Sequence, residues 1–241
     1  MFFEEIDKKI KLLNSKKPFP EYTLQSLREN LILEWTYNSN AIEGNTLTLQ
    51  ETKVVMEGIT IGGKSIREHF EVINHREAIL YVEDIIKNKE PLTEWQIKNI
   101  HNLVLKNIDD KNAGIYRKSN VVITGAKFIP PDFLFVPEQM NALIDVHNNN
   151  YSHPLEKAAL LHTIFVKIHP FVDGNGRTAR LLLNFELMKN GYLPIIIKKE
   201  NRLEYYASLD KAHISGDYTD FINITAKLEN EILDFYLKII G

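Results

Sequence analysis

The segment from His169 to Arg180 contains residue types that could together transfer a phosphorus-centred group. A histidine has an unperturbed pKa near ~6.5, so His169 could act as a general base at cellular pH. Asp173 offers the hard carboxylate oxygens that Mg²⁺ prefers when it bridges phosphates. Arg177 and Arg180 are three positions apart and would extend from one side of a helix. This combination within twelve residues predicts phosphoryl or nucleotidyl transfer.

The glycines of the same segment predict an anion site. Gly174-Asn175-Gly176 opens a helical pattern over 175–190. Glycine lets the backbone approach a ligand closely, and the first amides of a helix have no intrahelical partner. Those amides lie at the positive end of the helix dipole and favour phosphate oxygens. Because Pro170 cannot continue the preceding helix, His169 is expected where that buried helix meets the loop.

Helical periodicity dominates the elements that must position these residues. Apolar positions between Tyr22 and Glu43 recur at spacings of three, four or seven. Thr48 with Glu51, and Thr93 with Gln96, have the spacing of capping boxes and predict two helix starts. Further helical patterns are expected over 66–87, 137–149, 154–167, 175–190, 201–212 and 217–239.

Strand propensity is confined to one stretch. The runs Val121 to Ile123 and Phe128 to Ile129 flank Gly125, which predicts a β-hairpin. A lone hairpin is only marginally stable, so we expect it to lie against the helices. The predicted fold is therefore all-α, a helical bundle with one small β-hairpin flap. We expect residues 1–45 to form an N-terminal helical segment and residues 46–241 to form the catalytic domain.

Composition limits the function classes. The 241 residues include no cysteine, which excludes a disulfide framework, a thiolate zinc site and a cysteine nucleophile. The formal net charge is -3, so no basic excess indicates nucleic acid or an anionic membrane as a partner. The first residues lack the layout of a signal peptide, and no apolar run approaches the ~18 residues of a membrane span. We expect a cytoplasmic protein that binds neither nucleic acid nor membrane.

The catalytic segment resembles the signature of the Fic family, His-Pro-Phe-x-(Asp/Glu)-Gly-Asn-Gly-Arg-x-x-Arg, at every specified position. The resemblance implies a protein adenylyltransferase, which uses Mg²⁺ and ATP to place AMP on a Ser, Thr or Tyr hydroxyl of a target protein or of itself. The likeness covers most of residues 90–225 and includes the approach to the family's flap and its nucleotide-side helix, in Gly114-x-Tyr116-Arg117 and in Asn201, Tyr205 and Leu209.

The resemblance also implies a role for each residue of the signature. His169 is expected to take the proton of the target hydroxyl, and Asp173 to hold Mg²⁺ against the α- and β-phosphates. Arg177 is expected to neutralise charge that develops toward the leaving pyrophosphate. The catalytic residues implied are His169, Asn175 and Arg177. The ATP-binding residues implied are Gly174, Asn175, Gly176, Arg177, Arg180, Asn201 and Tyr205.

A second motif lies at the end of the first long helix. The stretch from Ser39 to Gly44 resembles the Fic inhibitory motif, (Ser/Thr)-x-x-x-Glu-(Gly/Asn), of the class that carries inhibition in its N-terminal part. A carboxylate in the last turn of a helix faces the negative end of the dipole, so another interaction is expected to retain Glu43. The resemblance implies that Glu43 pairs with Arg180, takes the space of the γ-phosphate and holds ATP in an unproductive pose. Ser39, one turn earlier, would help to fix the helix.

The expected hairpin has a part in target recognition. An exposed edge strand can pair with an extended segment of another protein and hold its hydroxyl in register. The docking residues expected are Val121, Val122, Ile123 and Thr124.

Other functions remain compatible with the sequence. The same site could remove AMP from a modified protein, with Glu43 positioning water, or use a different donor to transfer phosphate or phosphocholine. A different class is a regulatory binding module that senses nucleotide. A homodimer is compatible with this type of fold, but no residue pattern identifies an interface.

Overall fold

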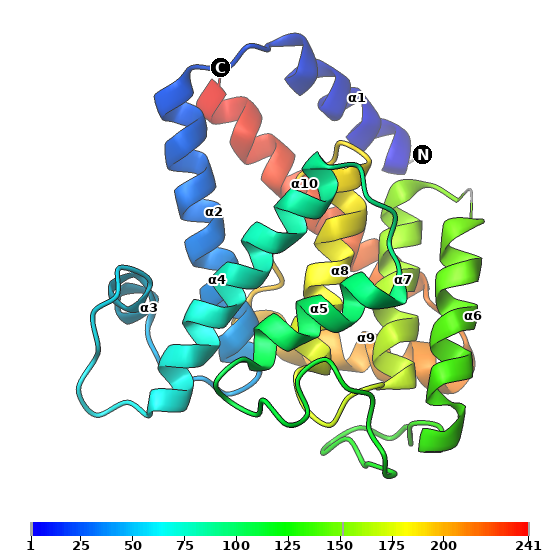
Figure 1. Cartoon of the computed structure of the whole chain (residues 1–241). Helices are drawn as coiled ribbons and strands as arrows, with labels where there is room; N and C mark the ends of the chain where they lie inside the picture. The colour runs from blue at the N-terminus through cyan, green and yellow to red at the C-terminus, as the bar shows by residue number, and fades with distance from the viewer. Residues whose placement is uncertain (1, 151, 241) are drawn as a thin grey trace.

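The computed structural model describes residues 2–150 and 152–240, and this part of the chain is helical (Figure 1). Its α-helices are α1 (Phe2–Ser15), α2 (Glu21–Ile42), α3 (Leu49–Met56), α4 (Ile66–Lys87), α5 (Glu94–Leu105), α6 (Val136–Asn148), α7 (Pro154–Ile168), α8 (Asn175–Lys189), α9 (Arg202–Ser215) and α10 (Thr219–Ile240). Two 3₁₀ helices, η1 (Phe133–Phe135) and η2 (Lys199–Asn201), precede α6 and α9.

Helix α8 forms the centre of the bundle, and α7, α5, α4 and α2 pack against it (Figure 1). Asn175 and every residue from Arg177 to Leu187 are buried. Helix α8 is thus buried on all sides although it carries two arginines. Buried charges require partners within the protein. The fold must therefore supply acceptors to Arg177 and Arg180 from the surrounding helices.

Two apolar clusters share α7 and α8. One cluster joins them to α4, α5 and α6, with Phe165, Phe171 and Phe185 among its fully buried side chains. The other joins them to α1, α2, α9 and α10 around Tyr205 and Phe221. Residues on both sides of α7 and α8 are thus held by packing, which fixes the loop that connects these two helices.

Local sequence signals locate the helix starts well. Thr48 and Thr93 form the predicted capping boxes with Glu51 and Gln96. The helices expected over 66–87 and 154–167 are observed at Ile66–Lys87 and Pro154–Ile168.

The predicted β-hairpin is wrong: residues 2–150 and 152–240 contain no strand. The turn itself forms, because Ala126 N–H donates to Ile123 C=O at 3.2 Å with Gly125 at φ 83°. The flanking runs do not pair into a ladder; side chains satisfy the loop instead. Asn120 Nδ2 donates to Asp132 Oδ2 at 2.9 Å, and Arg117 donates to the Ser119 carbonyl at 3.0 Å.

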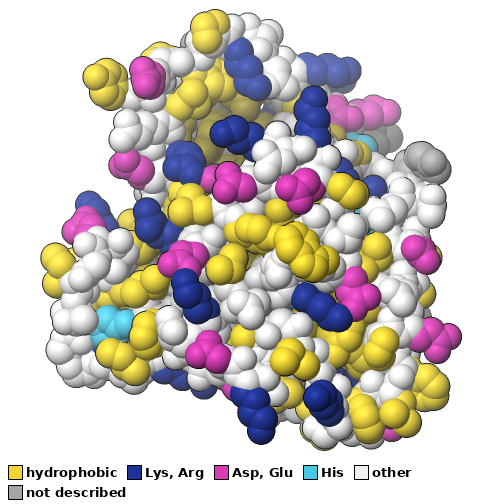
Figure 2. All heavy atoms as spheres, viewed as in Figure 1, with side chains coloured by type: hydrophobic (Ala, Val, Ile, Leu, Met, Phe, Trp, Pro, Cys, Tyr) yellow, Lys and Arg dark blue, Asp and Glu magenta, His cyan; other side chains and the backbone are white. Residues whose placement is uncertain are grey.

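The surface carries mixed charge. On the face shown in Figure 2, positive, negative and apolar side chains are interspersed. Within the described residues, no helix is both long and apolar enough to pass through a membrane.

Candidate active site

His169 lies at the end of α7 in a left-handed backbone conformation, with φ 50° and ψ 59°. This conformation is uncommon for a residue other than glycine and persists only where neighbours hold it. The His169 amide donates to the Phe165 carbonyl at 3.0 Å, and its own carbonyl accepts from Arg117 Nε at 2.9 Å. Arg117 N–H also donates to the Pro170 carbonyl at 2.9 Å. Buried Arg117 thus fixes the backbone on both sides of the His169–Pro170 bond.

The His169 ring is in its neutral form. Burial lowers its pKa to about 4, and the Arg117 guanidinium acts in the same direction, partly offset by the Glu43 and Asp173 carboxylates. The imidazole is therefore neutral at physiological pH, which is the form a general base requires.

Asn175 holds the loop between His169 and α8. Its Oδ1 accepts from Phe171 N–H at 3.0 Å, and its Nδ2 donates to the Phe171 carbonyl at 2.9 Å. Gly174, with φ 75°, allows the close approach that follows, since a Cβ there would lie 3.2 Å from His101 Nε2. The Asn175 side chain thus binds the protein's own backbone, and its amide N–H is the group available to an anion.

His101 on α5 supports the same loop, and the sequence analysis did not identify it. Its Nδ1 accepts from Gly114 N–H at 2.9 Å, so its Nε2 carries the proton and donates to the Asp173 carbonyl at 2.8 Å. The ring stacks on Phe171 with centroids 3.6 Å apart. Burial lowers the His101 pKa to about 4, which keeps this tautomer neutral. A single histidine within a helical pattern gives no signal of this role.

The Asp173 carboxylate is ionised and partly exposed. Oδ1 accepts from Gly174 N–H at 2.6 Å, and Oδ2 pairs with Arg67 Nη2 at 2.6 Å. Burial alone would raise the Asp173 pKa, but Arg177, the Gly174 amide and Arg67 outweigh it and hold that pKa below its ordinary value. In residues 2–150 and 152–240, no cluster of three or more His, Asp or Glu could hold a metal alone. One carboxylate suits Mg²⁺ only if water and nucleotide phosphates supply the other ligands, which is how Mg²⁺ commonly binds.

Arg177 belongs to a ring of charges that includes two residues of α4. Its Nη2 lies 3.3 Å from Asp173 Oδ1, and its Nη1 lies 3.3 Å from Glu71 Oε1. Glu71 also pairs with Arg67 at 3.1 Å and accepts from Asn45 Nδ2 at 2.9 Å. Glu71 and Arg67 could not be predicted from the sequence, because they lie about a hundred positions before Asp173 and outside both motifs.

Arg180 binds the end of α2. Its Nε donates to Ser39 Oγ at 3.0 Å, and its Nη2 donates to the Ser39 carbonyl and to Glu43 Oε1, both at 2.8 Å. A Cβ built on Gly176 would lie 2.3 Å from Glu43 Oε1. The Glu43 carboxylate therefore lies directly over the first turn of α8, where the helix dipole favours an anion.

The two residues assigned to the nucleoside end differ in burial. Tyr205 is 2% exposed, its hydroxyl lies 3.1 Å from His162 Nε2, and burial raises its pKa to about 12. Asn201 is exposed at the N-terminal end of α9. The four docking residues lie in the loop before η1, where Val122 is 78% exposed.

Comparison with known proteins agrees with this geometry. The model of the Fic/DOC family matches residues 91–187. The protein adenylyltransferase Fic of Nematostella vectensis is 42% identical over 206 residues, which cover 83% of this chain and 48% of that protein. The protein adenylyltransferase fic-1 of Caenorhabditis elegans is 40% identical over 217 residues, which cover 88% of this chain and 42% of that protein. The chain thus spans about half the length of the curated relatives it matches.

Solved structures show the same likeness over the whole described bundle. Fic-1 from C. elegans has a TM-score of 0.87 at 33% identity, covering 99% of this chain and 71% of that one. A Fic-domain signalling protein from Bacteroides thetaiotaomicron has a TM-score of 0.89 at 30% identity, and the match covers 100% of this chain and 97% of that one. On this agreement of sequence and structure, the chain belongs to the Fic/DOC family.

Proposed function

We propose that this chain transfers AMP from ATP to a hydroxyl of a protein. The observation that carries the proposal is the Glu43 carboxylate over the first turn of α8, bound to Arg180 at 2.8 Å. It identifies a site that accepts negatively charged oxygens, on the same loop as neutral His169 and ionised Asp173. The relatives named protein adenylyltransferases supply the reaction class.

In the proposed reaction, His169 removes the proton from the target hydroxyl as its oxygen attacks the α-phosphorus of ATP. The new O–P bond replaces the bond to pyrophosphate, which leaves with its negative charge. The amides of Asn175 and Gly176 bind phosphate oxygens, and Arg177 offsets the charge that develops on the leaving group. Mg²⁺ held by Asp173 would neutralise phosphate charge.

The positions of Glu43 and Ser39 support autoinhibition. Arg180 gives its Nε and Nη2 hydrogen bonds to these two residues, so a γ-phosphate that binds Arg180 through Nη2 must displace the carboxylate. The Glu43 carboxylate and a phosphate at this position would both be negatively charged, so their repulsion disfavours binding of the phosphate while Glu43 is in place.

The loop from Val121 to Thr124 supports target docking in a form different from the expected hairpin. Its residues are exposed or half-buried and lie outside any ladder in the described chain. An extended target segment could therefore add to this loop through backbone hydrogen bonds. We assign Asn201 and Tyr205 to the nucleoside end; Tyr205 would act as a buried support behind Arg180, whose charge affects its pKa.

A second candidate is removal of AMP from a modified protein. It is supported by the Glu43 carboxylate, whose charge raises the His169 pKa and which would orient the attacking water. In that reaction, the oxygen of water would bond to phosphorus as the bond to the target oxygen breaks. Glu43 would take a proton from the water, and that proton would pass through His169 to the leaving target oxygen.

The test is incubation with Mg²⁺ and ATP labelled on either the α- or the γ-phosphate. The parent, Glu43→Gly and the double variant Glu43→Gly/His169→Ala are each supplied with a cell lysate. Label from the α-phosphate alone, strongest in Glu43→Gly and lost without His169, supports AMP transfer. Label from the γ-phosphate that is likewise lost without His169 contradicts it. ATP binding without any transfer, combined with release of AMP from a previously modified protein, favours the second candidate. ATP binding without either reaction favours a nucleotide-sensing module.

A further inference from the structure

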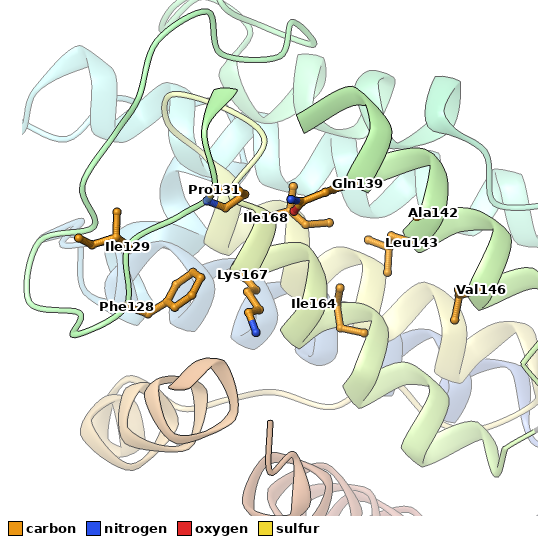
Figure 3. A pocket seen from close by; sticks show the side chains of 10 residues that line it. All are labelled: Phe128, Ile129, Pro131, Gln139, Ala142, Leu143, Val146, Ile164, Lys167 and Ile168. Carbon is orange, nitrogen blue, oxygen red and sulfur yellow. The ribbon is translucent and has the colours of Figure 1, made fainter. Parts of the chain in front are cut away.

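A groove of about 390 Å³ opens between α6, α7 and the loop before η1 (Figure 3). Apart from Gln139 and Lys167, its lining side chains are apolar. Ile168 on its floor is buried, whereas Ile129 and Val146 are 71% and 62% exposed. Exposed apolar surface around a concavity, with a few polar groups at its edge, is typical of a binding site.

The walls of the groove are linked to the proposed base through the backbone. Ile168 immediately precedes His169, the proposed base. Pro131, in the opposite wall, has its carbonyl bound by Arg117, which also holds the His169 carbonyl at 2.9 Å. A segment whose hydroxyl reaches His169 therefore has its neighbouring residues near this groove.

The loop wall is held in place from two helices. The Phe128 ring lies 5.3 Å from the His213 ring of α9, and Lys167 Nζ of α7 lies 5.4 Å from the Phe128 ring centre. Lys127 N–H donates to Asp210 Oδ1 of α9 at 3.3 Å. Because these contacts exist in the chain alone, a ligand would not have to order this wall on binding.

We propose that the groove selects targets by taking an apolar side chain from the segment that carries the modified hydroxyl, while Lys167 pairs with an acidic residue of that segment. The inference rests on the proposed AMP transfer. A volume of 390 Å³ is at the low end for ligand pockets and suits one or two large side chains rather than a cofactor. Four residues of extended chain span roughly 13 Å, so the apolar residue is expected within about four positions of the hydroxyl.

The probes are fluorescent peptides with one central threonine in a polar background. In each peptide, one position within four residues of the threonine carries either leucine or glutamine. The residue next to that position is either aspartate or lysine. Binding to the full chain carrying Glu43→Gly is measured by anisotropy without ATP, and AMP transfer is measured separately by mass spectrometry. The groove variant is Val146→Lys. Its matched control is Ile239→Lys, since Ile239 is 48% exposed on α10 and does not line the groove.

The expected result is that leucine at one position strengthens binding about tenfold or more over glutamine. Val146→Lys should abolish this preference and Ile239→Lys should retain it. Lys167→Glu should reverse the preference for aspartate over lysine. Equal leucine preferences in the parent and in Val146→Lys would overturn the proposal. A parent dimer that Val146→Lys dissociates would also overturn it, because a second copy would then occupy the groove. Selective peptide binding without AMP transfer would contradict the proposed reaction and leave the groove intact.

Discussion

The Glu43 carboxylate accepts a hydrogen bond from Arg180 at 2.8 Å, so the last turn of α2 is joined to the central helix α8. Arg180 is 3% exposed. A buried guanidinium without its carboxylate is an uncompensated charge, which binding of another anion would stabilise. In this chain the available anion would be a nucleotide phosphate.

Glu43→Gly is expected to increase AMP transfer. Each ~1.4 kcal/mol that favours the blocked state lowers the competent fraction tenfold, so an increase of about tenfold or more is expected. Ser39→Ala removes one acceptor of Arg180 but keeps the Ser39 carbonyl, and should give a smaller increase. Initial rates with α-labelled ATP check both. A parent rate equal to that of Glu43→Gly would contradict inhibition.

Arg67→Gln is expected to lower the Mg²⁺ concentration needed for half-maximal rate. Arg67 occupies Asp173 Oδ2 at 2.6 Å, and Mg²⁺ must compete with it for that oxygen. A half-exposed ion pair contributes about 0.2–1 kcal/mol, so a shift of up to about fivefold is expected in the Glu43→Gly background. Arg76→Gln, at an exposed position of the same helix, is the control. A Mg²⁺ requirement that rises would show that Arg67 supports the metal site instead.

The AMP-transfer rate should not fall between about pH 8 and pH 5.5. The folded pKa of His169 is lowered to about 4, so the base stays neutral over this range and is protonated only at lower pH. The charge of Glu43 raises the His169 pKa, so removing Glu43 lowers this pKa further and keeps the base neutral. The measurement is kcat/KM against pH for Glu43→Gly, with His169→Ala expected to lower the plateau by about 10²–10⁴. A decline with its midpoint near the ordinary ~6.5 would contradict this assignment.

His101→Gln is expected to make stability less sensitive to acid. The His101 pKa falls from its ordinary value to about 4 on folding, so between ~6.5 and about 4 the unfolded chain binds more protons. The free energy of unfolding therefore decreases as pH falls through that window, by up to ~1.4 kcal/mol per pH unit for this histidine. Urea unfolding at several pH values measures the slope. Identical slopes in parent and variant would show that His101 does not account for this dependence.

Sequence patterns predicted the helices because their signals are local. Thr48 and Thr93 mark helix starts through capping boxes that each span only four residues, and Pro170 marks the end of α7. The hairpin failed because strand pairing depends on more than β-prone residues: Arg117 and Asn120 satisfy the loop through side-chain bonds. The signature placed His169, Asp173 and Arg180 on one loop and helix. The supports from α4 and α5 come from distant chain segments, and only the folded arrangement brings them to that loop.

The last turn of α2 is bound to α4 independently of Glu43. Asn40 Nδ2 donates to the Glu71 carbonyl at 3.2 Å, and Asn45 Nδ2 donates to the Glu68 carbonyl at 3.1 Å. The backbone on both sides of Glu43 can therefore stay in place while its side chain, one third exposed, rotates away. Activation would then be a change of rotamer, on the timescale of side-chain motion, rather than the unfolding of a helix. On the proposed autoinhibition, a ligand or partner that binds the Glu43 carboxylate more strongly than Arg180 does would release the block.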